Sequence, residues 1–352
     1  MDAELVPKQL ATLEPETLGG QNAIQYLIGF FFFVVGVVGV WLHGLNVKRL
    51  MKLDLILPEG FVSLHFHLAL ANLGIVAMVP FGGVSAFFHR GCCFPCRWCF
   101  SVVGCQLYAF EGMLCGITSI ALTCTICILQ YVDWKFDWKL RGGVYHLIAI
   151  GAWTHGFIWA ILPILGVGSY ALEPHQTNCA LDMTRQDRLS IFYLCALTLV
   201  TYVIPVGAAV VSLCLLWFTL TTDLQPTESD SNTDMSWTNW LRHTFGIPLK
   251  QPAKQMSEKP QSTLNQRLKL CTKVNAGILL TSILTWFPLG TLATCIILYG
   301  DPGLNPMFYY VPQLLAKWGC ALTPVAYVST LRRLQRQKHS SNLFVQLDTK
   351  KQ

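Results

Sequence analysis

The sequence predicts an all-α membrane protein, built as a bundle of seven transmembrane helices. Of the 352 residues, 53% are hydrophobic and only 12% are charged, whereas an ordinary soluble domain carries about 25% charged residues. Seven segments are long and apolar enough to cross a bilayer. We place these spans at 24–46, 61–88, 103–132, 144–168, 189–219, 272–299 and 307–331.

Each span is supported by its own residues. Spans one, four and five lie within stretches that contain no charged residue, namely 21–47, 142–172 and 189–222. The second span is also uncharged, and the third carries a single acid, Glu111, well inside it. The sixth span contains Pro288, which is expected to kink its helix. The seventh contains a single base, Lys317.

The basic residues of the loops predict the orientation of the chain. Lys and Arg gather after spans one, three and seven, at Lys48, Arg49, Lys52, Lys135, Lys139, Arg141, Arg332, Arg333, Arg336 and Lys338. Because cytoplasmic loops carry this excess, we expect a multi-pass integral membrane protein with its N-terminus extracellular or luminal and its C-terminus cytoplasmic. The net charge of +6 is mostly this cytoplasmic excess and not a nucleic-acid signal. We expect membrane lipid and no nucleic acid among the partners.

These assignments divide the chain into three parts. Residues 1–23 form an extracellular N-terminus, 24–331 a seven-helix domain with a long cytoplasmic loop at 220–267, and 332–352 a cytoplasmic tail. The loop is rich in Ser, Thr, Pro and Gln, a composition typical of disordered segments. The stretch "STLRRLQRQ" after the last span predicts a short amphipathic eighth helix along the inner leaflet.

Lys317 is the residue that most needs a functional explanation. An ammonium at mid-bilayer costs at least about 2.5–3.5 kcal/mol, and roughly ten apolar or neutral residues flank Lys317 on both sides. Desolvation favours the neutral amine, which is a nucleophile toward carbonyls. Lys317 is therefore a candidate for a covalent Schiff base or an ion site. A lysine that snorkels to the interface is the alternative.

Four cysteines cluster in "HRGCCFPCRWCF", at Cys92, Cys93, Cys96 and Cys99. The spacing lacks the second distant pair that a zinc site usually has. Additional disulfides are the better expectation on the oxidising side of the membrane. We predict no metal site.

Several motifs together resemble the opsins, within the rhodopsin-like G-protein-coupled receptors. In "VPQLLAKWGCALTPVAY" a proline precedes the lysine by four residues, and Pro324 and Tyr327 follow at the spacing of the NPxxY motif. The segments "QLYAFEG" and "WAILPILGVGSYALEP" are closest to the branch of the retinal G-protein-coupled receptor opsins, retinochromes, neuropsins and peropsins. The resemblance implies that Lys317 carries retinal, 11-cis or all-trans, as a Schiff base.

The resemblance also assigns roles around that lysine. It implies a disulfide between Cys105 and Cys179, which holds the second extracellular loop across the pocket as a plug. Glu173, six residues before Cys179, matches a counterion position in that plug. Glu111 is the second counterion candidate. The pocket contacts that we expect are Trp286, Tyr108 and Phe287, and Tyr108 stands where vertebrate visual opsins place a carboxylate.

Other positions depart from the family pattern. Leu129 and Gln130 replace the acid and arginine that contact a G protein, and Thr323 replaces the asparagine before Pro324. His43 and Asn72 replace the polar residues of spans one and two.

We therefore expect a non-visual light-sensing receptor with atypical coupling to a heterotrimeric G protein. A retinochrome-type photoisomerase that converts all-trans to 11-cis retinal is the alternative, and we assign no catalytic residue. A non-photic receptor or transporter, in which Lys317 binds an acid, is a third class.

Overall fold

The computed structural model describes residues 15–53, 59–88, 98–136, 140, 142–173, 178–222, 258–300 and 308–327. The predicted eighth helix, most of the 220–267 loop and the C-terminal tail lie outside these residues. Within them, six helical segments are long and apolar enough to cross a membrane. A further helix covers residues 308–327 and carries Lys317. The prediction of a seven-helix bundle is confirmed.

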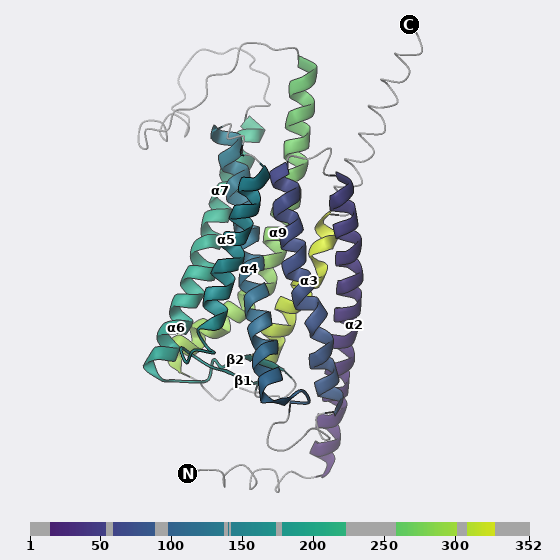
Figure 1. Cartoon of the computed structure of the whole chain (residues 1–352), viewed down its shortest axis with the longest axis vertical. Helices are drawn as coiled ribbons and strands as arrows, with labels where there is room; N and C mark the ends of the chain where they lie inside the picture. The colour runs from purple at the N-terminus through teal and green to yellow at the C-terminus, as the bar shows by residue number, and fades with distance from the viewer. Residues whose placement is uncertain are drawn as a thin grey trace.

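The helices run alongside one another along the long axis of the molecule (Figure 1). In chain order they are α2 (Pro15–Leu53), α3 (Glu59–Phe88), α4 (Ser101–Phe136), α5 (Gly142–Ile161), α6 (Arg188–Thr198), α7 (Ile204–Thr222), α9 (Glu258–Tyr299) and the helix of residues 308–327. Two short strands, β1 (Tyr170–Leu172) and β2 (Cys179–Leu181), lie at one end of the bundle. We call this the strand end.

The fifth span is interrupted in a way that apolar patterning does not predict. Between α6 and α7 the chain makes one turn of π-helix, η1 (Leu199–Val203), in which the Ile204 N–H donates to the Leu199 carbonyl. This turn comes just before Pro205, which has no N–H to donate to residue 201 and whose ring crowds that carbonyl. The wider turn accommodates the proline without breaking the span.

The two strands form an antiparallel hairpin that the helices hold firmly. Leu172 pairs with Cys179, and Cys179 is disulfide-bonded to Cys105 on α4, as the sequence predicted. From β1, the buried Tyr170 hydroxyl donates to the Ala160 carbonyl at 2.7 Å. Burial raises the pKa of this phenol, so the hydroxyl keeps its proton. The hairpin is thus tied to both α4 and the end of α5.

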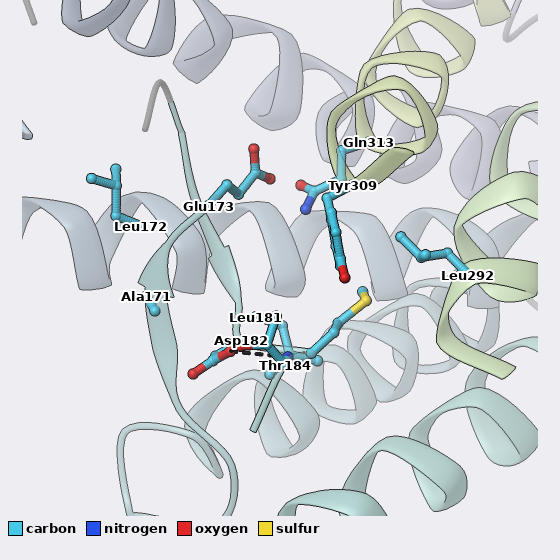
Figure 2. A pocket seen from close by; sticks show the side chains of 10 residues that line it. Ala171, Leu172, Glu173, Leu181, Asp182, Thr184, Leu292, Tyr309 and Gln313 are labelled. Atoms are coloured by element: carbon cyan, nitrogen blue, oxygen red, sulfur yellow. Dashed lines mark hydrogen bonds between the residues drawn. The ribbon is translucent and has the colours of Figure 1, made fainter. Parts of the chain in front are cut away.

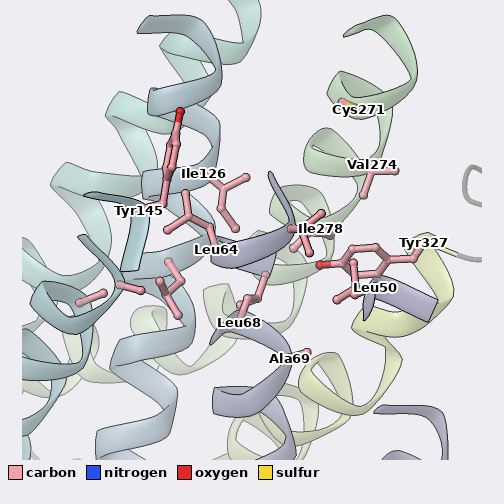
Figure 3. Close-up of a cluster of buried hydrophobic side chains, with 14 of the residues drawn as sticks. Leu50, Leu64, Leu68, Ala69, Ile126, Tyr145, Cys271, Val274, Ile278 and Tyr327 are labelled. Atoms are coloured by element: carbon pink, nitrogen blue, oxygen red, sulfur yellow. The ribbon is translucent and has the colours of Figure 1, made fainter. Parts of the chain in front are cut away.

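At the opposite end, the core is an apolar cluster drawn from α2, α3, α4, α5, α9 and the last helix (Figure 3). Leu50, Leu68 and Leu122 are fully buried in it. Tyr327 is also fully buried and reaches from the last helix toward α3. The cluster forms the apolar core of this end of the bundle.

Removing the disulfide is expected to loosen the strand end. The bridge closes a loop with a sequence separation of 74, for which the chain-entropy relation gives about 4.5 kcal/mol. We expect Cys105→Ser to lower the thermal midpoint of the purified protein by several degrees. Cys295→Ser, at an exposed cysteine of α9, is the matched control and should leave the midpoint unchanged. Equal midpoints for the two variants would contradict the expectation.

Candidate functional site

Lys317 points into the bundle interior, where a second polar group meets it. Its side chain is partly buried, and Nζ donates to the Tyr108 hydroxyl on α4 at 3.2 Å. Two aromatic rings face the ammonium, with Nζ 5.0 Å from the Phe32 centroid and 5.2 Å from that of Tyr108. A cation over a ring face is attracted by about 0.5–2 kcal/mol. These contacts point inward, so they do not support a lysine that snorkels to the interface.

Tyr108 connects the lysine to the strand hairpin. Its hydroxyl donates to Asn178 Oδ1 at 3.1 Å, and Asn178 is fully buried just before β2. Gly82 on α3 makes room for this contact, because a Cβ there would lie 2.3 Å from Asn178 Oδ1. A short chain of hydrogen bonds therefore runs from Lys317 through Tyr108 to the plug.

Glu173 lies at the end of the same hairpin. The hairpin continues past β1, where the Glu173 N–H donates to the Asn178 carbonyl at 2.8 Å, and the Glu173 side chain is only 6% exposed. Its carboxylate interacts electrostatically with Lys317, Tyr108 and Tyr310. The structure therefore brings together the lysine and the carboxylate that the sequence singled out.

Glu173 also lines a pocket at the strand end (Figure 2). Gln313 and Tyr309 from the last helix, Leu292 from α9 and residues of both strands line it. Gln313 stands one helical turn before Lys317 and therefore on the same helix face. Figure 2 shows the Glu173 carboxylate and the Gln313 amide facing one another across the pocket. Glu173 thus lines a cavity at the strand end and also interacts electrostatically with Lys317.

Glu111 takes a different position. It lies on α4 beside Gly74 of α3, where a Cβ would come within 3.0 Å of its Oε1. It shares a hydrogen bond with Cys115. Lys317 interacts with both carboxylates, and more strongly with Glu173 than with Glu111. Glu111 is thus a carboxylate bonded within its own helix, and the larger electrostatic interaction supports Glu173 as the partner of the lysine.

Trp286 and Phe287 are neighbours in the sequence, but their side chains lie on different faces of α9. Trp286 packs between two buried clusters, and its ring lies so close to Gly116 that a Cβ there would be 2.8 Å from the ring edge. Phe287 is 61% exposed. One step along a helix turns a side chain by about 100°, which carries Phe287 away from the interior. The prediction that Phe287 lines the pocket is corrected here.

Three contacts of the site were not found in the sequence. Phe32 comes from the first span, and its contact with Lys317 depends on how two helices distant in the chain pack together. Asn178 is next to the cysteine of the plug, so its position could have been considered. Gln313 precedes Lys317 by four residues, and helical spacing alone would have placed it on the same face.

The positions that depart from the opsin pattern are nevertheless well bonded. His43 Nε2 lies 2.9 Å from the Cys320 carbonyl, three residues after Lys317. Asn72 accepts a hydrogen bond from the Ser119 hydroxyl at 2.6 Å. These replacements thus provide polar links between spans without a formal charge.

The fold and the site define a class: a seven-helix membrane receptor with a lysine inside the bundle and a strand hairpin closing one end. The sequence matches the family described as 7 transmembrane receptor (rhodopsin family) over residues 63–327. This chain belongs to that family.

Relatives and a solved structure extend the comparison. The chain is 25% identical over 317 residues to retinochrome of Todarodes pacificus, covering 89% of this chain and 92% of that protein. It is 27% identical over 179 residues to the RPE-retinal G protein-coupled receptor of Mus musculus, covering 51% of this chain and 58% of that protein. The crystal structure of squid rhodopsin has the same fold, with a TM-score of 0.69 at 19% identity, covering 92% of this chain and 87% of that one.

Proposed function

We propose that this protein is a non-visual opsin that binds retinal through Lys317 and senses light. One observation carries the proposal: Lys317 Nζ points into the bundle, within reach of Tyr108 and in the field of the buried carboxylate of Glu173. When bound, retinal supplies light absorption and the rotating double bond. The amine for its attachment, a carboxylate for charge balance and a large ring at Trp286 are all present, so the residues fit this cofactor.

The roles of the side chains follow from charge. A carboxylate close to a nitrogen favours the protonated form of that nitrogen, so we assign Glu173 the role of counterion at Lys317 Nζ. Tyr108 accepts from Nζ and donates to Asn178, and this orients the lysine toward the plug. Glu111 is the second carboxylate in the same field. The names of two relatives, retinochrome and the RPE-retinal G protein-coupled receptor, support the choice of retinal as cofactor.

The orientation of the protein follows the loop charges. We place the strand end outside the cell or in the lumen and the opposite end in the cytoplasm. There a heterotrimeric G protein is the expected partner, although its contacts are altered. Gln130 stands where family members carry the arginine that contacts the G protein.

This departure favours a second candidate function, photoisomerisation of all-trans to 11-cis retinal. In that case the pocket decides which bond rotates and no signal needs to leave the bundle. Both functions use the same lysine, so attachment of retinal does not distinguish them.

Analysis of extracted isomers distinguishes the two functions. The protein is loaded with all-trans or with 11-cis retinal, and the isomers are extracted before and after illumination while nucleotide exchange is followed on a panel of G proteins. For the receptor we expect a several-fold, light-dependent rise in exchange on at least one G protein. Net conversion of all-trans to 11-cis retinal without any exchange would favour the isomerase. Absence of retinal uptake would contradict both.

A further inference from the structure

Two histidines from different spans meet in the half of the bundle opposite the strands. His67 lies on α3 and His146 on α5, and His67 Nε2 is 3.2 Å from His146 Nδ1. The Ser63 hydroxyl lies one helical turn before His67, on the same face of α3, and is 3.2 Å from the same Nδ1. The histidines are 79 positions apart in the chain, so no local motif marks the pair in the sequence.

The start of α5 is held firmly against α3 and α4. Gly60 on α3 leaves room for the Tyr145 ring, since a Cβ at Gly60 would lie 2.3 Å from Tyr145 Cζ. The Tyr145 hydroxyl donates to Asp133 Oδ2 on α4 at 2.9 Å, and its ring is buried in the apolar cluster (Figure 3). His146 directly follows Tyr145, so these contacts fix the backbone that carries it beside His67.

Hydrogen bonding alone does not account well for this arrangement. A neutral imidazole nitrogen has either one lone pair or one N–H, yet His146 Nδ1 faces His67 and Ser63 at the same distance. Both distances are at the long end of the usual range for hydrogen bonds. Three polar atoms therefore gather where one nitrogen can serve only one partner at a time.

The same distances suit neighbouring ligands of one metal ion. Zinc binds imidazole nitrogen at about 2.0–2.1 Å in a tetrahedral arrangement, which separates neighbouring ligand atoms by about 3.3–3.4 Å. The separation of 3.2 Å between the two imidazole nitrogens is close to this value. Imidazole is a good ligand for zinc, copper and nickel, whereas magnesium and calcium prefer oxygen ligands.

We propose that His67 and His146 form a binding site for a divalent transition metal of the class of Zn²⁺, with the Ser63 hydroxyl as a weaker third ligand. No other His, Cys, Asp or Glu joins the pair within the residues that the structure describes, so water completes the coordination shell. His146 is exposed near the start of α5, where an ion can reach it from the membrane interface. The bound metal links α3 to α5, and neither Lys317 nor retinal takes part.

Modification by diethylpyrocarbonate tests the site one histidine at a time. The reagent attacks a free imidazole lone pair, and a metal on one nitrogen leaves the other as N–H, so binding protects both rings. Full-length protein in nanodiscs is modified at constant pH with and without Zn²⁺, and mass spectrometry gives the rate at each histidine. With Zn²⁺ about tenfold above its dissociation constant, about one site in eleven is free, so modification of His146 should slow about tenfold.

Two controls accompany this measurement on the wild-type protein. His155 is on the same helix but packs against Trp159, so Zn²⁺ should leave its rate unchanged. Mg²⁺ should protect neither histidine of the pair. Thermal midpoints without added metal show that each variant is folded.

His67→Gln is the decisive variant, because it keeps a hydrogen-bonding side chain but removes an imidazole. Zn²⁺ should then slow modification of His146 by about twofold or less. Ser63→Ala should weaken the protection only partly, and His155→Gln, the matched control, should retain all of it. Absence of protection at His146 in the wild type would overturn the proposal. So would equal protection in His67→Gln, which would mean that His146 binds an adventitious ion only.

Discussion

Lys317→Ala is expected to abolish the visible absorbance that wild-type protein acquires with retinal. The variant lacks the amine that lies inside the bundle beside Tyr108, and alanine cannot form the covalent link. Absorbance spectra after incubation with 11-cis and with all-trans retinal measure the effect. After reduction with borohydride, mass spectrometry of the wild-type protein should find the retinyl group on the peptide that contains Lys317.

Two further variants separate attachment from folding. Lys317→Arg keeps a positive charge and a long side chain but cannot condense with an aldehyde, so it should fold and remain colourless. Lys273→Ala removes an exposed lysine of α9 and should bind retinal as the wild type does. Visible pigment in Lys317→Ala, or a retinyl group found on Lys273, would show that the attachment site is wrong.

Glu173→Gln is expected to move the absorbance of the retinal-loaded protein from the visible into the near ultraviolet at neutral pH. The change keeps the shape of the side chain but removes the charge that favours a proton on Lys317 Nζ. Without that charge the protonated form is less stable, so the pKa of the nitrogen should fall by roughly two units or more. The sign is testable: lowering the pH should restore the visible band. Spectra recorded from alkaline to acidic pH give the pKa of this nitrogen in the wild type and in Glu173→Gln.

The neighbouring carboxylates provide the controls. Asp182 lines the same pocket as Glu173 but accepts its hydrogen bonds from the Thr184 N–H and hydroxyl. Asp182→Asn should leave the spectrum unchanged. Glu111→Gln should cause a smaller shift than Glu173→Gln, because Lys317 interacts less strongly with Glu111. The reverse order of the two shifts would assign the counterion role to Glu111.

Much of this arrangement could be predicted because membrane spans follow simple rules. Uncharged stretches of sufficient length predicted the spans. Lys317 was recognised as a functional residue because it is the isolated base of the last span. The likeness of the plug to the opsins gave the Cys105–Cys179 pair. Phe32 escaped prediction because its contact depends on packing between the first and last spans. Phe287 was misplaced because its neighbour Trp286 does face inward, and the helix turns the next residue away.

The links among polar residues were the hardest part to predict. Gln130 and Thr323 could be recognised only as departures from a family pattern, which says what is missing and not what replaces it. That Gln130 meets both Asn275 and Thr272 depends on the rotation and height of α9 relative to α4. Neither quantity is encoded in the residues of one helix alone.

The Cys105–Cys179 bond also has a consequence for how the protein matures. It fixes the hairpin that ends in Glu173, and it can form only in an oxidising compartment. A chain inserted in the membrane but still reduced would have its lysine in place before the carboxylate is secured beside it. On our assignment, competence to hold a protonated chromophore is gained during secretory maturation, after membrane insertion. Assembly of the pigment would therefore depend on an oxidising compartment in which the Cys105–Cys179 bond can form.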